Sequence, residues 1–205
     1  MDNFNVFPDN SIKAGGPVSN VFIDLGITRL LEACRYVHEL PYGYNSNSDD
    51  LMILFKENKG TCTTKHAVIG TLARELALPV YKNIGIYAMT EEIVSGTDWL
   101  LAKFRLPYIP MLHCFLVYEN FRVDLTEGNS NGKNRSIEEY LYVQQVEPNI
   151  SAKDEYLLYR EALNDVVLKR PEFSGVNLKQ ILRSREEGLK LLKANLLSGD
   201  GSITL

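Results

Sequence analysis

Apolar positions recur along the chain with two different periods, one typical of helices and one typical of strands. The helical period predicts a helix over residues 27–37, which Pro41 ends, and a short helix over about 48–55. A longer helix is expected over 62–78. Two more follow over 151–170 and 178–192, so the C-terminal part is predicted to be helical.

The extended period dominates the middle of the chain. Residues 81–89, 111–118 and 121–126 are rich in Val, Ile, Phe and Tyr, and we expect them to be strands. The stretch 90–110 contains Gly and Pro and is expected to be irregular. Residues 136–139 read Ser-x-x-Glu, the pattern of a capping box, which predicts a short helix there.

These elements predict an α+β fold with an antiparallel sheet. Residues 1–20, rich in Asn, Gly and Pro, are expected to be an N-terminal loop or arm. Residues 21–150 would form the core, and 151–205 a helical flank of the same domain.

Composition narrows the class of protein. The chain has 205 residues, 45% of them hydrophobic, as in globular proteins. It carries 22 Lys and Arg against 26 Asp and Glu, a net charge of −4, which argues against a nucleic-acid partner. No stretch approaches the ~20 apolar residues of a membrane span, and the N-terminus lacks an export signal. We therefore expect a cytoplasmic protein with no membrane or nucleic-acid partner, while its oligomeric state stays open.

The three cysteines, Cys34, Cys62 and Cys114, are too few and too scattered for a disulfide framework, which fits a reducing compartment. Cys34 lies on an apolar helical stripe and is expected to be buried. Cys62 follows Gly60 and opens a predicted helix. There the unpaired N–H groups and the helix dipole favour a thiolate and can bind an oxyanion, so Cys62 is a candidate nucleophile.

A histidine and an aspartate are predicted to meet on the hairpin that follows. If Glu119 and Asn120 form a two-residue loop, Phe115 lies opposite Asp124. His113 then shares a face with Phe115, so His113 and Asp124 are diagonal neighbours about 7–8 Å apart at the backbone. The hairpin would thus supply a base and the carboxylate that orients it.

These residues resemble the transglutaminase-like superfamily of cysteine enzymes. The resemblance rests on the run GTCTTKHA at 60–67, the downstream His and Asp, and the flanking runs VHELPYG at 37–43 and LALPV at 76–80. It covers about residues 27–127 and not the helical C-terminal part.

The resemblance implies a papain-like core, with the nucleophile helix packed on an antiparallel sheet. It implies that Cys62 is the nucleophile, His113 the general base and acid, and Asp124 the orienting residue. The reaction would be acyl transfer through a thioester, on a peptide, protein or other amide substrate, with water or an amine as acceptor. No cofactor or metal is implied, and Tyr42, Tyr44 and Asn45 are candidates for a second oxyanion donor.

Several alternatives remain open. In one, the domain has lost the activity and serves as a binding or scaffold module. In the others, Cys62 pairs with His66 one helical turn later, or these two bind zinc with His113 and Cys114. An arylamine acetyltransferase would share the chemistry but has an Arg-Gly-Gly lead-in that is not found here. His38 is expected near the end of a helix, as a surface residue or as a favourable charge at the helix end.

Overall fold

The computed structural model describes residues 3–199, and its contacts divide the chain into two compact units. One unit comprises Met1–Ile84, His113–Asn129 and Gln144–Glu155. The other comprises Gly85–Leu112, Ser130–Val143 and Tyr156–Leu205. All three residues of the predicted site belong to the first unit.

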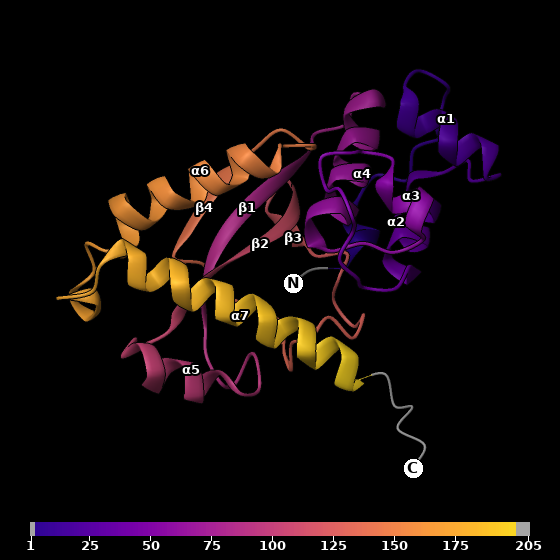
Figure 1. The fold of residues 1–205 in the computed structure, drawn as a ribbon. Helices are drawn as coiled ribbons and strands as arrows, with labels where there is room; N and C mark the ends of the chain where they lie inside the picture. Colours follow the sequence, from indigo (N-terminus) through magenta and orange to yellow (C-terminus); the bar gives the residue numbers. More distant parts are fainter. Residues whose placement is uncertain (1–2, 200–205) are drawn as a thin grey trace, which may run out of the picture. The chain divides into compact units, whose positions relative to one another are not determined.

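A four-stranded antiparallel sheet and several helices make the fold α+β, as the sequence predicts. The strands are β1 (Val80–Met89), β2 (Ile109–Tyr118), β3 (Phe121–Val123) and β4 (Tyr142–Gln145), in the order β3-β2-β1-β4 (Figure 1). Both β1 and β2 contribute residues to each of the two units.

The hairpin between β2 and β3 has the register that the sequence predicts. Tyr118 lies opposite Phe121 and Leu116 opposite Val123, so the loop contains two residues. Its first residue, Glu119, has a φ of 52°, the left-handed conformation that such tight hairpin loops require. The prediction of the hairpin is confirmed.

The expectation of a helix at Ser136 is wrong. Residues 136–141 are not helical, and β4 follows them directly. The Leu141 N–H donates to the Ile86 carbonyl at 2.7 Å, and the Tyr140 ring lies where a side chain on Gly85 would be. Pairing and packing against β1 therefore override the local capping pattern.

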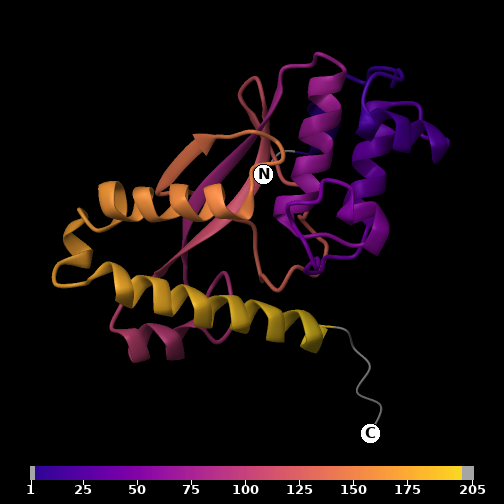
Figure 2. The same cartoon turned by 45° about the horizontal axis from the view of Figure 1, so that its top comes forward.

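In the first unit, three helices pack around the helix that begins at Cys62. This helix, α4 (Cys62–Glu75), contacts α1 (Pro17–Asp24), α2 (Leu30–Glu39) and α3 (Ile53–Glu57) (Figure 1 and Figure 2). Every residue of α4 from 64 to 73 is buried. A helix enclosed on several sides gives its first turn a fixed position, which matters for the chemistry of Cys62.

The N-terminal segment, which we expected to be a loop or arm, contributes to the core of this unit. A short 3-10 helix, Phe4–Val6, begins it, and Phe7, Ile12 and Val18 are buried. The carboxylate of Glu75, at the end of α4, accepts the N–H groups of Val18 and Ser19 at 3.1 and 2.7 Å. A carboxylate remote in sequence thus caps α1, which local composition does not reveal.

α3 begins later than expected. Asp50 accepts the N–H of Met52 at 3.0 Å and turns the chain there, so the helix begins at Ile53 and not near residue 48.

In the second unit, α5 (Thr97–Phe104) packs against α7 (Leu178–Gly199), and most of α6 (Ala152–Ala162) lies here too. A π-helical turn, Leu163–Val167, and a 3-10 turn, Pro171–Phe173, follow α6. Both predicted C-terminal helices are present, but α6 ends at Ala162 instead of near residue 170, and α7 extends to Gly199 instead of ending near 192. α5 falls in the stretch expected to be irregular.

α5 was missed because its start depends on two special residues. Its N-cap, Gly96, has a φ of 91°, and the Glu91 carboxylate accepts the N–H groups of Gly96 and Asp98, each at 2.9 Å.

Among the described residues, no helix combines the length and the apolar character that a membrane crossing requires.

Candidate functional site

Cys62 is the first residue of α4, with Thr61 as its N-cap. The Thr64 hydroxyl accepts the Thr61 N–H at 3.1 Å, which fixes the turn around the thiol. A Cβ atom on Gly60 would lie 2.7 Å from this hydroxyl oxygen, so only glycine fits there. The lead-in pairs with an earlier segment, since the Gly60 N–H donates to the Pro41 carbonyl at 3.1 Å. The Cys62 residue is 9% exposed.

His113 and Asp124 bind each other directly. The distance between His113 Nε2 and Asp124 Oδ2 is 2.5 Å, and both side chains are buried. The other carboxylate oxygen, Oδ1, accepts the N–H and the hydroxyl of Thr126 at 2.8 and 2.7 Å. This local turn ends β3 at Val123, earlier than predicted, and it aims the carboxylate at the histidine ring.

His66 connects the two halves of the site. Its Nδ1 lies 2.7 Å from the Cys62 carbonyl oxygen, and its Nε2 accepts the Leu125 N–H at 2.8 Å. Because Nε2 is an acceptor, the ring proton is on Nδ1 and is donated to Cys62 O. Burial lowers the pKa of His66 to about 4, although the nearby Asp124 charge acts in the opposite direction. His66 is therefore neutral, and it joins the first turn of α4 to the segment that holds Asp124.

The alternative pairing of Cys62 with His66 does not fit this arrangement, because both ring nitrogens of His66 bind main-chain groups. Cys62, His113 and Asp124 all act on the pKa of His66 electrostatically, and the rings of His66 and His113 are 6.5 Å apart. The residues of the proposed triad thus lie around one buried imidazole. The spacing of His66, one helical turn after Cys62, is visible in the sequence, but its bonds to the Cys62 carbonyl and the Leu125 N–H cannot be predicted from it.

Cys114 is a second residue that sequence reasoning did not assign to the site. Its side chain hydrogen-bonds with that of Cys62, and its sulfur lies 3.8 Å from the Thr63 hydroxyl. This bond and burial raise the pKa of Cys114 well above the usual value, while the charge of Lys82 acts to lower it. Lys82 is itself buried and donates to the carbonyls of Thr63 and Pro148 at 3.1 and 3.0 Å.

Asn45, a candidate for the second oxyanion donor, is used elsewhere. Its Nδ2 donates to Glu57 and to the Lys59 carbonyl, both at 3.0 Å, and its Oδ1 accepts the Thr64 hydroxyl at 2.8 Å. Both amide hydrogens therefore have structural partners. The other two candidates, Tyr42 and Tyr44, are partly buried, with their rings edge to face 6.5 Å apart.

Lys65 fixes the segment that precedes these tyrosines. Its buried ammonium donates to the carbonyls of His38 and Leu40 at 3.1 and 2.5 Å, and Asn129 donates to the same two oxygens. Burial lowers the pKa of Lys65 to about 8, against the opposing charge of Asp124. His38 lies in the last turn of α2, as expected, but it is partly buried rather than on the surface, and its Nδ1 lies 3.1 Å from the Leu125 carbonyl oxygen.

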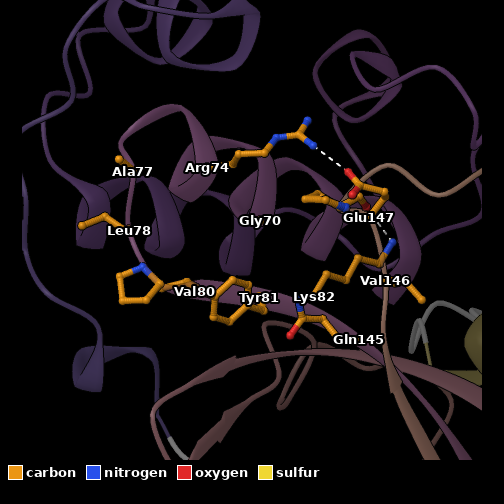
Figure 3. Close-up of a pocket in the computed structure, with 12 residues that line it drawn as sticks. Gly70, Arg74, Ala77, Leu78, Val80, Tyr81, Lys82, Gln145, Val146 and Glu147 are labelled. Carbon is orange, nitrogen blue, oxygen red and sulfur yellow. Dashed lines mark hydrogen bonds and ion pairs between the residues drawn. The ribbon is translucent and has the colours of Figure 1, made fainter.

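A separate cavity of about 610 Å³ lies beside the C-terminal half of α4 (Figure 3). Gly70 and Arg74 line it from α4, Lys82 from β1 and Gln145 from β4, and Arg74 pairs with Glu147 at its edge. None of the three predicted catalytic residues lines this cavity.

Within residues 3–199, no three His, Cys, Asp or Glu side chains are grouped so that they could hold a metal ion. The remaining cysteine, Cys34, is buried as expected, and burial raises the pKa of its thiol. No family model matches the chain, and no curated protein or solved structure gives a significant match. The functional argument therefore rests on the residues themselves.

Proposed function

We propose that the protein is a cysteine-dependent acyl-transfer enzyme with a papain-like, transglutaminase-like core, in which Cys62, His113 and Asp124 act together. The observation that carries the proposal is the buried contact of 2.5 Å between His113 Nε2 and Asp124 Oδ2. A carboxylate that holds one ring nitrogen fixes the tautomer and stabilises the imidazolium. The pair lies on the β2–β3 hairpin, and the neighbouring residue Cys114 on β2 contacts Cys62. Nucleophilic catalysis requires a nucleophile, a base and a group that orients the base.

In this proposal the two ring nitrogens of His113 have different roles. Because Asp124 binds Nε2, the nitrogen that exchanges a proton with the Cys62 thiol is Nδ1 of His113. The thiolate then attacks the carbonyl of an amide, and His113 returns the proton to the departing amine. A thioester to Cys62 results, which water hydrolyses with His113 as the base.

The first turn of α4 provides stabilisation of charge. In this proposal, main-chain N–H groups of this turn donate to the oxyanion of the tetrahedral intermediate, and the helix dipole favours the Cys62 thiolate. Cys114 adds a donor to the Cys62 sulfur, because its raised pKa keeps it protonated at neutral pH. These contributions support Cys62 rather than Cys34 or Cys114 as the nucleophile.

The substrate in this proposal is a peptide, protein or other amide, and the usual acceptor is water. Hydrolysis, deamidation and peptidase-type cleavage share this chemistry, as does cross-linking when an amine replaces water. The protein would act in the cytoplasm. The competing proposal, a catalytically silent binding module, makes Cys62 an ordinary thiol.

A panel of acyl-ester and electrophilic peptide probes tests the proposal. Intact-mass analysis should detect one covalent adduct on Cys62, with none on Cys34 or Cys114 in the native protein. The adduct should be absent in Cys62→Ala and form at least about tenfold more slowly in His113→Ala, while Cys34→Ala matches the wild type. Equal, slow modification of all three thiols would support the binding module and contradict the enzyme.

A further inference from the structure

The Cys62 and Cys114 side chains hydrogen-bond to each other, although 52 positions separate them in the sequence. Cys62 opens α4, and Cys114 lies on β2 with its sulfur 3.8 Å from the hydroxyl of Thr63. The two residues differ in exposure, since Cys62 is 9% exposed and Cys114 only 1%. We therefore expect a small oxidant to react with Cys62 before Cys114.

We infer that Cys114 is the resolving thiol for Cys62, and that hydroperoxides convert the pair into an intramolecular disulfide. In the first step the Cys62 thiolate attacks a peroxide oxygen. A sulfur–oxygen bond forms, the oxygen–oxygen bond breaks, and the peroxide leaves as an alcohol or water after taking up a proton. Cys62 is oxidised by two electrons to a sulfenic acid.

In the second step the Cys114 sulfur attacks the sulfenic sulfur of Cys62. The sulfur–sulfur bond forms and the sulfur–oxygen bond breaks. Hydroxide leaves with the proton from the Cys114 thiol, as water. The sum is two thiols and one hydroperoxide giving one disulfide, one alcohol (or water) and one water. A dithiol reductant returns two electrons and two protons and restores both thiols.

Lys82 favours the second step, although burial and the bond to Cys62 raise the pKa of Cys114 overall. Its ammonium is buried, it binds the carbonyl of Thr63, and its charge acts to lower the pKa of Cys114. A positive charge beside the attacking thiol stabilises the thiolate that must form.

The disulfide would have two consequences. It blocks the sulfur of Cys62, so the chemistry proposed above stops until a reductant arrives; this part of the inference rests on the proposed function. It also removes the sulfenic acid before a second peroxide turns it into the sulfinic acid, which thiols do not reduce. Cys114 thus protects the nucleophile from irreversible loss.

Peroxide treatment of the full-length protein, followed by denaturation and alkylation with N-ethylmaleimide, tests the inference. The wild type should fall from three alkylatable thiols to one, and digestion should give one cross-linked peptide pair containing Cys62 and Cys114. Dithiothreitol should restore all three. The matched control Cys34→Ala should behave in the same way, with both of its remaining thiols lost and regained.

The variant Cys114→Ala removes the resolving thiol and replaces it with a residue of similar size. Its Cys62 should be trapped by dimedone after peroxide treatment and then pass to the sulfinic acid, which dithiothreitol does not reverse. Identical Cys62 products in the wild type and in Cys114→Ala, with Cys114 still alkylated, would overturn the inference, as would a disulfide that links two chains.

The acyl-probe adduct on the reduced protein separates this inference from the proposed function. An adduct on Cys62 without any peroxide-induced disulfide refutes the inference and leaves the acyl-transfer proposal standing. A Cys62–Cys114 disulfide in a protein that no probe modifies supports the inference and refutes the acyl-transfer proposal.

Discussion

His113 and Asp124 face each other across the β2–β3 hairpin, with 2.5 Å between Nε2 and Oδ2. The two residues are buried, and a turn at Thr126 holds the second carboxylate oxygen. A charge-assisted bond this short fixes the orientation of the ring. The proposed chemistry depends on this orientation because it determines which nitrogen of His113 is available for proton exchange with Cys62.

Replacing Asp124 by Asn should damage the proton transfer more than the fold. The amide oxygen can keep the bonds to Thr126, which places the NH2 group against His113 Nε2. Nε2 then becomes an acceptor and the proton moves to Nδ1, so His113 no longer takes a proton from Cys62. We expect alkylation of Cys62 at neutral pH to slow by about tenfold or more, measured by mass spectrometry with iodoacetamide.

The control for this variant is Asp165→Asn, at an exposed carboxylate that pairs only with Lys169 at 3.5 Å. It should alkylate at the wild-type rate. An Asp124→Asn protein that melts normally and alkylates as fast as the control would contradict the role of Asp124.

His66 should make the folded state sensitive to acid. Burial lowers its pKa from 6.5 to about 4, so the unfolded chain binds the proton more readily. The contribution of neutral His66 to stability is fully present above pH 6.5 and is lost as the pH falls, and the loss reaches about 3 kcal/mol near pH 4. Urea unfolding between pH 7 and pH 4 should therefore show a falling free energy of unfolding. His66→Gln should flatten this fall, whereas His38→Gln should keep it; equal slopes would contradict the buried, neutral state of His66.

Gly60→Ala should destabilise the first turn of α4. The added methyl group would meet the Thr64 hydroxyl at 2.7 Å and Leu54 at 3.1 Å, so neighbouring atoms must move. We expect a loss of about 1–3 kcal/mol in the free energy of unfolding, measured by urea denaturation. Gly15→Ala is the matched control, because its nearest neighbour would be 3.9 Å away. Equal stability of the two variants would exclude a close contact at Gly60.

Lys65→Met should loosen the segment before Tyr42. The change removes two donors to the carbonyls of His38 and Leu40 and leaves Asn129 as their partner. Because the aliphatic part of the side chain is kept, the expected cost of about 1–3 kcal/mol reports the lost hydrogen bonds. Hydrogen exchange should rise in residues 38–44, and the exposed Lys153→Met should leave both measurements unchanged. A stable variant with unchanged exchange would show that Lys65 does not hold this segment.

The sequence predicts the parts of this protein that depend on local chemistry. Period two, together with a two-residue loop at Glu119, was sufficient to place His113 and Asp124 on the same face, and the observed register confirms that step. The start of a helix at Cys62 followed from Gly60 and the apolar period in the same way.

The features that the sequence does not reveal depend on partners far along the chain. The cap of α1 comes from Glu75, and the strand β4 forms because β1 offers an edge, in place of the helix expected at Ser136. The contacts of His66 and Cys114 form only when α4 lies against the segment that contains β2 and β3. Neither residue stands in a local sequence motif that would predict them. Long-range pairing decided these cases, and no period or capping motif encodes it.

The pH dependence of Cys62 alkylation tests the central claim most directly. If His113 and Cys62 exchange a proton, the rate should stay high well below pH 8.5, the usual pKa of a free thiol, and should fall only where the ion pair is protonated. His113→Ala should return the profile to that of an ordinary thiol, about tenfold or more slower at pH 6. A wild-type profile that follows an ordinary thiol and is unchanged in His113→Ala would contradict the account.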